Sequence, residues 1–428
     1  MQCARITSLL AALALLPSVS LAQETALGPL REAAQKATTD PSAALALGRA
    51  LRRAGHPDEA LLQLRRGAAL QTGHEPGNAI LLHREIARAY VDKRDFGQAV
   101  VACRVVGAQT GGGPAGHACM AEAHLLWRRG SEALAEAALA LANGSHVVDA
   151  KIAEGRAYAL TLDEAKAEAS LREAITWDAN AADAYVALAE VLESTHRHDL
   201  AVDALKKAAQ LDPASPDAAY ALGRALPPGP EAIVSLEHAT RDRPTFTAAW
   251  TTLATDLLAQ NRAADAHKAA ETALHGAAQD VNAHVLMGKV WLAESKPDDA
   301  LREAAVALGI VANSAPAKLI VADAYAQKGE IDLALEHYQA AYGFDHTEAT
   351  PLLHAAAACI KANRTTSAKA YGTKATTDFP SLAAAWVMLG DALVADKEGP
   401  AAKTAYDKAL TLPNVDATSV RAKIVAIH

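Results

Sequence analysis

The chain has 428 residues, of which about a quarter are alanine and only 4% aromatic, and its 49 Asp and Glu outnumber its 41 Lys and Arg. This acidic balance argues against nucleic-acid binding, which requires a basic surface that displaces counterions from phosphates. Abundant alanine favours helices, and strands would lack their usual β-branched and aromatic residues. The composition therefore predicts an all-α protein.

The first residues have the pattern of a signal peptide. Arg5 precedes an apolar stretch at residues 6–16, and Ser20 and Ala22 place small residues at the −3 and −1 positions of a cleavage site. A transmembrane anchor would need about 20 apolar residues, and polar residues arrive too early for one. We expect a signal peptide over residues 1–22, cleavage after Ala22, and a mature chain that does not span the membrane and is located in the periplasm.

An alanine recurs along almost the whole chain, and eight of its ten steps are 34 residues long. This series is Ala60, Ala99, Ala133, Ala167, Ala201, Ala232, Ala266, Ala300, Ala334, Ala368 and Ala402. A second series of small residues lies twelve positions earlier, or nine in one case: Gly48, Ala87, Ala121, Gly155, Ala189, Gly223, Ala254, Gly288, Ala322, Ala356 and Gly390. A fixed period of this length indicates a stack of similar units, which form one continuous body.

These series resemble the tetratricopeptide repeat, a 34-residue unit of two antiparallel helices with small residues at fixed positions. Trp250 and Trp386 near the start of the first helix and Pro213 at the closing position also fit. The resemblance implies an all-α, right-handed superhelical solenoid of about eleven helix-turn-helix repeats over residues 41–414. Capping helices are expected at residues 23–40 and 415–428. The residues that define the repeat include Gly48, Ala60, Gly155, Ala167, Ala189, Ala201, Gly288, Ala300, Gly390 and Ala402.

The sixth repeat departs from the pattern because it has lost three residues, and its turn reads Pro-Pro-Gly-Pro at 227–230. Such a turn cannot continue a helix. It is either a harmless deletion or a functional hinge.

Arginine is frequent on the first helices of the early repeats, which in the family line the concave groove. Residues 23–148 carry 14 Lys and Arg against 12 Asp and Glu, whereas the remaining mature chain carries 26 against 37. Arginine suits bidentate binding of carboxylates. We therefore predict a groove that binds an acidic or extended partner segment through Arg49, Arg52, Arg53, Arg84, Arg88, Arg156 and Arg224. The alternative is that these arginines are helix-forming surface residues.

The mature chain has three cysteines, Cys103, Cys119 and Cys359. Cys103 and Cys119 lie on consecutive predicted helices, so a disulfide could join them, and two free buried thiols are equally ordinary. Cys359 occupies a core position.

No pattern of residues indicates catalysis, a metal or a cofactor. The densest histidine group, at residues 196–199, lies in a turn and lacks the spacing of metal ligands. The expected function is a non-enzymatic, periplasmic scaffold for protein–protein interaction in a cell-envelope assembly serving secretion, export, motility or outer-membrane biogenesis. The alternative is a non-catalytic regulatory or substrate-recruiting subunit of an envelope enzyme. Self-association is open.

Overall fold

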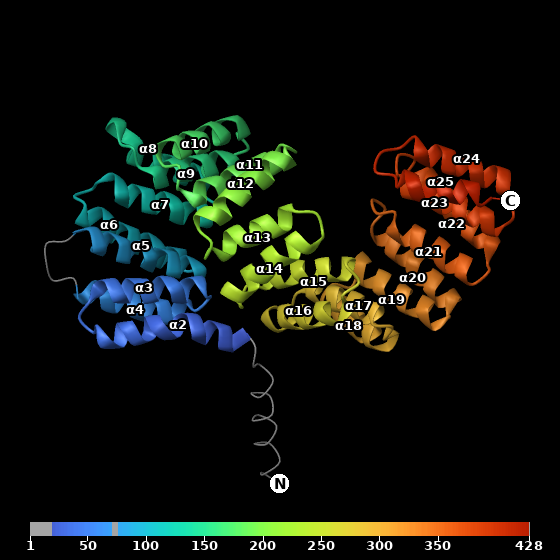
Figure 1. Cartoon of the computed structure of the whole chain (residues 1–428), viewed down its shortest axis with the longest axis horizontal. Coiled ribbons are helices and arrows are strands. Elements are labelled where there is room, and N and C mark those ends of the chain that lie inside the picture. Colours follow the sequence, from blue (N-terminus) through green and yellow to red (C-terminus); the bar gives the residue numbers. More distant parts are fainter. Residues whose placement is uncertain (1–18, 71–75, 428) are drawn as a thin grey trace, which may run out of the picture. The chain divides into compact units, whose positions relative to one another are not determined.

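The computed structural model describes residues 19–70 and 76–427, so most of the predicted signal peptide lies outside the described residues. The described chain is helical throughout and forms two compact units that divide after Leu253 (Figure 1). Among these residues, no helix is both long and apolar enough to cross a membrane. The prediction of an all-α solenoid is confirmed.

The first unit contains a leading helix, α2, followed by six helix pairs. Its helices are α2 (Val19–Lys36), α3 (Pro41–Arg53), α4 (Pro57–Leu70), α5 (Pro76–Asp92), α6 (Phe96–Gln109), α7 (Pro114–Leu126), α8 (Gly130–Leu141), α9 (Val148–Leu160), α10 (Glu164–Trp177), α11 (Ala182–Ser194), α12 (His198–Leu211), α13 (Pro216–Ala225) and α14 (Pro230–Asp242). A short 3-10 helix, η1 (Ala142–Gly144), follows α8. The boundary of the units falls within α15 (Thr247–Ala259).

The second unit continues the helix pairs and closes with a short terminal helix. Its helices are α16 (Ala263–Gly276), α17 (Val281–Ala293), α18 (Pro297–Ile310), α19 (Ala315–Lys328), α20 (Ile331–Phe344), α21 (Thr350–Lys361), α22 (Thr365–Asp378), α23 (Ala383–Ala395), α24 (Gly399–Leu410) and α25 (Ala417–Val425). Val420 of α25 is buried against Tyr406 and Leu393, so α25 covers the apolar end of the last pair.

Small residues lie where the two helices of a repeat cross. Ala60, Ala167, Ala201, Ala300 and Ala402 are all fully buried. Gly155 and Gly390 allow an even closer approach: a Cβ atom would lie 2.6 Å from Cγ of Leu171 at Gly155 and 2.4 Å from the ring of Tyr406 at Gly390. The 34-residue period therefore follows from packing, because only small side chains fit between helices at this distance.

Most turns between paired helices place one residue in the left-handed conformation. The residue is Gly55 in the first repeat and Gly329 in the ninth, and the other repeats use Arg94, Arg128, Leu162, His196, Asn261, Ser295, Asn363 and Lys397. The shortened turn of the sixth repeat, between α13 and α14, has no such residue among those described. The deletion thus removes the residue in the left-handed conformation from this turn, and it shortens α13 to ten residues.

Leu162 is unfavourable in this position and offers a test of the turn geometry. Its φ is 62°, a costly value for a side chain without a local hydrogen bond, and it is 85% exposed, so it contributes little packing. We expect Leu162→Gly to raise the free energy of unfolding by about 0.5–1 kcal/mol in denaturant titrations. The matched control is Leu62→Gly within α4, also exposed, which should lower it by about 1 kcal/mol. A loss of stability in both variants would contradict the argument.

Candidate functional site

The first unit has a half-open cavity of about 760 Å³ on its inner face. First helices of successive repeats contact one another around this face: α3 contacts α5, α5 contacts α7, α7 contacts α9, α9 contacts α11 and α11 contacts α13. The loops that precede α11, α13 and α15, together with Leu211 at the end of α12, contribute the rest of the lining. The cavity is therefore built from equivalent positions of several repeats.

Three of the predicted groove arginines surround one buried carboxylate, Glu85 of α5. Nε of Arg49 and Nε of Arg52 each lie 3.1 Å from a carboxylate oxygen of Glu85, and Arg88 lies 3.4 Å from it. The Glu85 side chain is only 4% exposed. These guanidinium groups are thus engaged within the chain.

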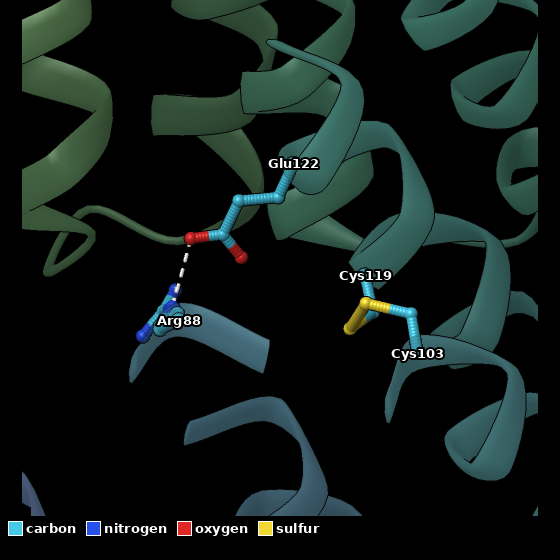
Figure 2. The surroundings of a disulfide bond; sticks show 4 residues. All are labelled: Arg88, Cys103, Cys119 and Glu122. Carbon is cyan, nitrogen blue, oxygen red and sulfur yellow. Dashed lines mark hydrogen bonds and ion pairs between the residues drawn. A yellow bond between two sulfur atoms is a disulfide. The ribbon is translucent and has the colours of Figure 1, made fainter. Parts of the chain in front are cut away.

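Arg88 also joins α5 to α7, because its Nε lies 2.8 Å from Oε1 of Glu122 (Figure 2). Burial by itself would raise the pKa of Glu122, but the charges of Arg88 and Arg84 outweigh it and hold the pKa below its ordinary value. Burial would likewise raise the pKa of Glu85, but the positive charges of Arg52, Arg88 and Arg49 outweigh burial and lower it. Both carboxylates are therefore charged at neutral pH and tie three repeats together.

Arg53 makes contacts that reach across the unit to the end of the fifth repeat and beyond. Its guanidinium lies 2.8 Å from Oδ2 of Asp212, and its carbonyl oxygen accepts a 3.0 Å hydrogen bond from Nε of Arg243. Arg243 holds Asp217 through two 2.8 Å hydrogen bonds. Helix α14 also contacts α2, as the helices of this unit in Figure 1 show. The first unit consequently closes on itself after six repeats.

Gly55 lies at this closure and meets Thr245. A Cβ atom on Gly55 would lie 1.8 Å from Oγ1 of Thr245, and the φ of Gly55 is +84°. We expect Gly55→Val to open the closure and to lengthen and broaden the distance distribution between spin labels at exposed positions 62 and 234. Gly329→Val is the matched control, because its φ is +80° and no atom lies within 4 Å of its Cβ position. Both changes should cost about 1–2 kcal/mol of backbone strain, but only the first should change the distance.

The remaining predicted arginines divide into one paired and two unpaired residues. Arg84 lies 2.8 Å from Asp149. Arg156 and Arg224 form no ion pair with any described residue, although Arg224 lies 5.8 Å from the ring centre of Tyr220. Arg49 and Arg84 line neither this cavity nor the second one described below.

The lining of the cavity contains more carboxylates than arginines, a balance that the sequence count of the early repeats did not indicate. Its basic residues are Arg52, Arg53, Arg88, Arg156 and Arg243, and its acidic residues are Asp92, Glu122, Asp149, Asp178, Asp183, Asp212 and Asp217. Four of these carboxylates come from the fifth and sixth repeats or the segments before them, which the closure brings to the same cavity. Sequence reasoning missed Asp212, Asp217 and Arg243 because they lie at repeat ends, outside the positions that line an open groove.

A second cavity of about 580 Å³ adjoins the first and has a more apolar wall. The two share Glu122, Leu126, Arg156, Val186 and Asp217. The second unit has its own cavity of about 450 Å³, where Asp323 accepts a 2.6 Å hydrogen bond from the Tyr338 hydroxyl and lies 2.8 Å from Nδ1 of His354. The hydrogen bond between His354 and Asp323 raises the pKa of His354.

Cys103 of α6 and Cys119 of α7 form a disulfide bond across the turn that joins the second and third repeats (Figure 2). Cys359 of α21 is free and fully buried, and burial raises the pKa of its thiol. In the part of the chain that the structure describes, no group of three or more His, Cys, Asp or Glu residues is arranged to hold a metal ion. His196 lies in the turn before α12 and His198 is the first residue of that helix, where its Nδ1 contacts Glu193.

Comparison with known proteins agrees with this geometry. Two sequence models described as tetratricopeptide repeat match residues 182–215, which cover α11 and α12, and residues 251–315. The same helix pair and small-residue crossings recur through the rest of the described chain. This chain is a tetratricopeptide-repeat protein. No curated protein shows a significant sequence match to it.

Solved structures of similar architecture include yeast Tom70, which aligns with a TM-score of 0.48 at 13% identity over 90% of this chain and 95% of that chain. A tetratricopeptide repeat protein from Parabacteroides merdae ATCC 43184 aligns with a TM-score of 0.46 at 14% identity, over 65% of this chain and 97% of that one. The MamA protein aligns with a TM-score of 0.35 at 21% identity, over 40% and 94% of the respective chains.

Proposed function

We propose that this tetratricopeptide-repeat protein is a non-catalytic scaffold that binds a segment of a partner protein in the cavity of its first unit. The observation that supports this most directly is the construction of that cavity. First helices of successive repeats present charged and apolar side chains to one half-open cavity, and the arginine–carboxylate network around Glu85 and Glu122 fixes several of them in place. A rigid inner face of this kind lowers the entropy that binding must overcome.

We further propose that the protein acts in the periplasm as part of a cell-envelope assembly. Support comes from the signal-peptide pattern of residues 1–22 and from the disulfide between Cys103 and Cys119, which suits an oxidising compartment. Mass spectrometry of the protein isolated from a periplasmic fraction should find Gln23 as the first residue. Recovery of an intact N-terminus from the cytoplasmic fraction would overturn this part of the proposal.

The binding proposal is tested by using residues 23–428 as bait in an envelope extract. The informative variant reverses the charge of Arg156 and Arg224, because these arginines form no ion pair within the part of the chain that the structure describes, and their loss should leave the fold intact. Reversal at Arg49 or Arg88 would instead break the buried network at Glu85. The control is Arg104→Glu, an exposed arginine on α6, outside both cavities.

A partner that binds the wild-type protein and the Arg104 variant, and is lost with the Arg156/Arg224 variant, would support binding in the cavity. A partner retained by every variant would place binding elsewhere. If that partner is an envelope enzyme, the protein is better described as its recruiting subunit.

A further inference from the structure

The second cavity of the first unit combines an apolar wall with a few charged side chains. Its apolar residues come from α7, α9, α11 and α13 and include Leu126, Leu160, Val186 and Tyr220. Phe246, in the loop before α15, also lines it. Leu126 is 47% exposed, so a large apolar side chain faces the solvent here. Such a wall is suited to the apolar side chains of a bound segment.

Five charged residues line the same cavity, and they differ in whether the chain already satisfies them. Glu122 pairs with Arg88, and Asp217 pairs with Arg243. Arg156, Glu190 and Arg224, which occupy the same position of three successive repeats, form no ion pair with any described residue. The unpaired charges of this cavity are therefore two guanidinium groups and one carboxylate.

Arg156 has a further property that distinguishes it from the other arginines. Its Nε atom is buried, and no acceptor among the described residues reaches it. It lies near enough to Glu122 to lower the pKa of that carboxyl, but not within ion-pair distance. A buried donor without an acceptor destabilises the protein, so an acceptor that arrives with a ligand removes this unfavourable contribution.

We infer that Arg156 binds a side-chain carboxylate of the partner segment, and that apolar residues next to this carboxylate pack against the wall formed by Leu126, Leu160 and Val186. The inference rests on the proposed function. An internal Asp or Glu fits better than a chain end, because Arg156 lines both adjoining cavities and a segment can extend past it on either side. Arginine is suited to this role because its fork can bind both carboxylate oxygens.

The test selects ligands from a displayed library of random peptides, presented in one arm with a linker after the peptide and in the other with a free C-terminus. The wild-type full chain should enrich peptides with Asp or Glu beside Leu, Ile, Val or Phe, and it should do so in the linker arm. Enrichment confined to the free C-terminus would overturn the choice of an internal side chain. If neither arm yields any enriched peptide, both the proposed function and this inference fail.

A double-mutant cycle on one selected peptide then assigns the contact. Arg156→Gln and the acid-to-amide change in the peptide should each weaken binding about tenfold or more, and the second change should add little to the first. Arg156→Lys should recover part of the affinity, and Arg104→Gln should have none of these effects. Circular dichroism of the variants verifies the fold. If Arg156→Gln binds the peptide as tightly as the wild type, or if the two losses simply add, the carboxylate is bound elsewhere and the inference is wrong.

Discussion

Glu85→Gln is expected to lower the free energy of unfolding of the first unit by about 3 kcal/mol, because it removes the negative charge shared by Arg49, Arg52 and Arg88. A buried ion pair contributes little net stability when it is compared with a well-packed apolar pair. Removal of one partner is costly, because the other charges stay buried without compensation. Arg52 retains Asp92 and Arg88 retains Glu122, so the loss should fall short of complete unfolding.

Hydrogen exchange is the most direct measurement, because repeat proteins open locally and neighbouring repeats stabilise one another. Protection should fall in α3, α5 and α7 of the Glu85→Gln variant. The matched control is Glu59→Gln: Glu59 lies 3.0 Å from Arg31 at the surface, and its loss should cost no more than about 1 kcal/mol. Equal effects of the two substitutions would show that the network around Glu85 contributes no more than a surface pair.

The same network predicts how stability depends on pH. The pKa values of Glu85 and Glu122 are lowered in the folded chain, from an ordinary value of 4.5. Their contribution is therefore fully present above that value and is lost as the pH falls through the lower folded values. Burial raises the pKa of Asp92, which acts in the opposite direction over the same range. The acid-induced loss of protection should be smaller in Glu85→Gln than in the wild type.

Replacement of both Cys103 and Cys119 by alanine is expected to lower the stability of the second and third repeats by about 3 kcal/mol. The two cysteines are 16 residues apart in sequence, and closing a loop of this length restricts the unfolded chain by about that amount. The loss should appear as faster hydrogen exchange in α6 and α7, and the α20–α24 segment of the second unit should be unchanged.

A reducing agent provides the control for this prediction. It should destabilise the wild-type protein as much as the double substitution does, and it should leave the substituted protein unaffected. Cys359→Ala should keep the sensitivity to the reducing agent, because Cys359 takes no part in the bond. A wild-type protein whose exchange is the same with and without the reducing agent would contradict the prediction.

The repeat architecture could be predicted from the sequence because its cause is local and periodic. A helix crossing that tolerates only Gly or Ala recurs every 34 residues, so residues such as Gly155, Ala167, Ala201 and Ala300 identify the helix pairs before any coordinates are known. The same regularity located the arginines of the inner face. It could not show which of them are available for a ligand, because that depends on acidic partners one or more repeats away.

Only the tertiary structure showed that the first unit closes on itself. The closure joins Arg53 to Asp212 and to Arg243, residues at least 159 positions apart in sequence, and it brings carboxylates from repeat ends into the cavity. Each repeat contributes a small rotation relative to the one before, and these rotations accumulate along the unit. The sequence by itself thus determined the repeating unit and its first-helix surface. The accumulated rotation decided which charges meet, and it left Arg156 and Arg224 beside an apolar wall without an ion pair to any residue in the described ranges.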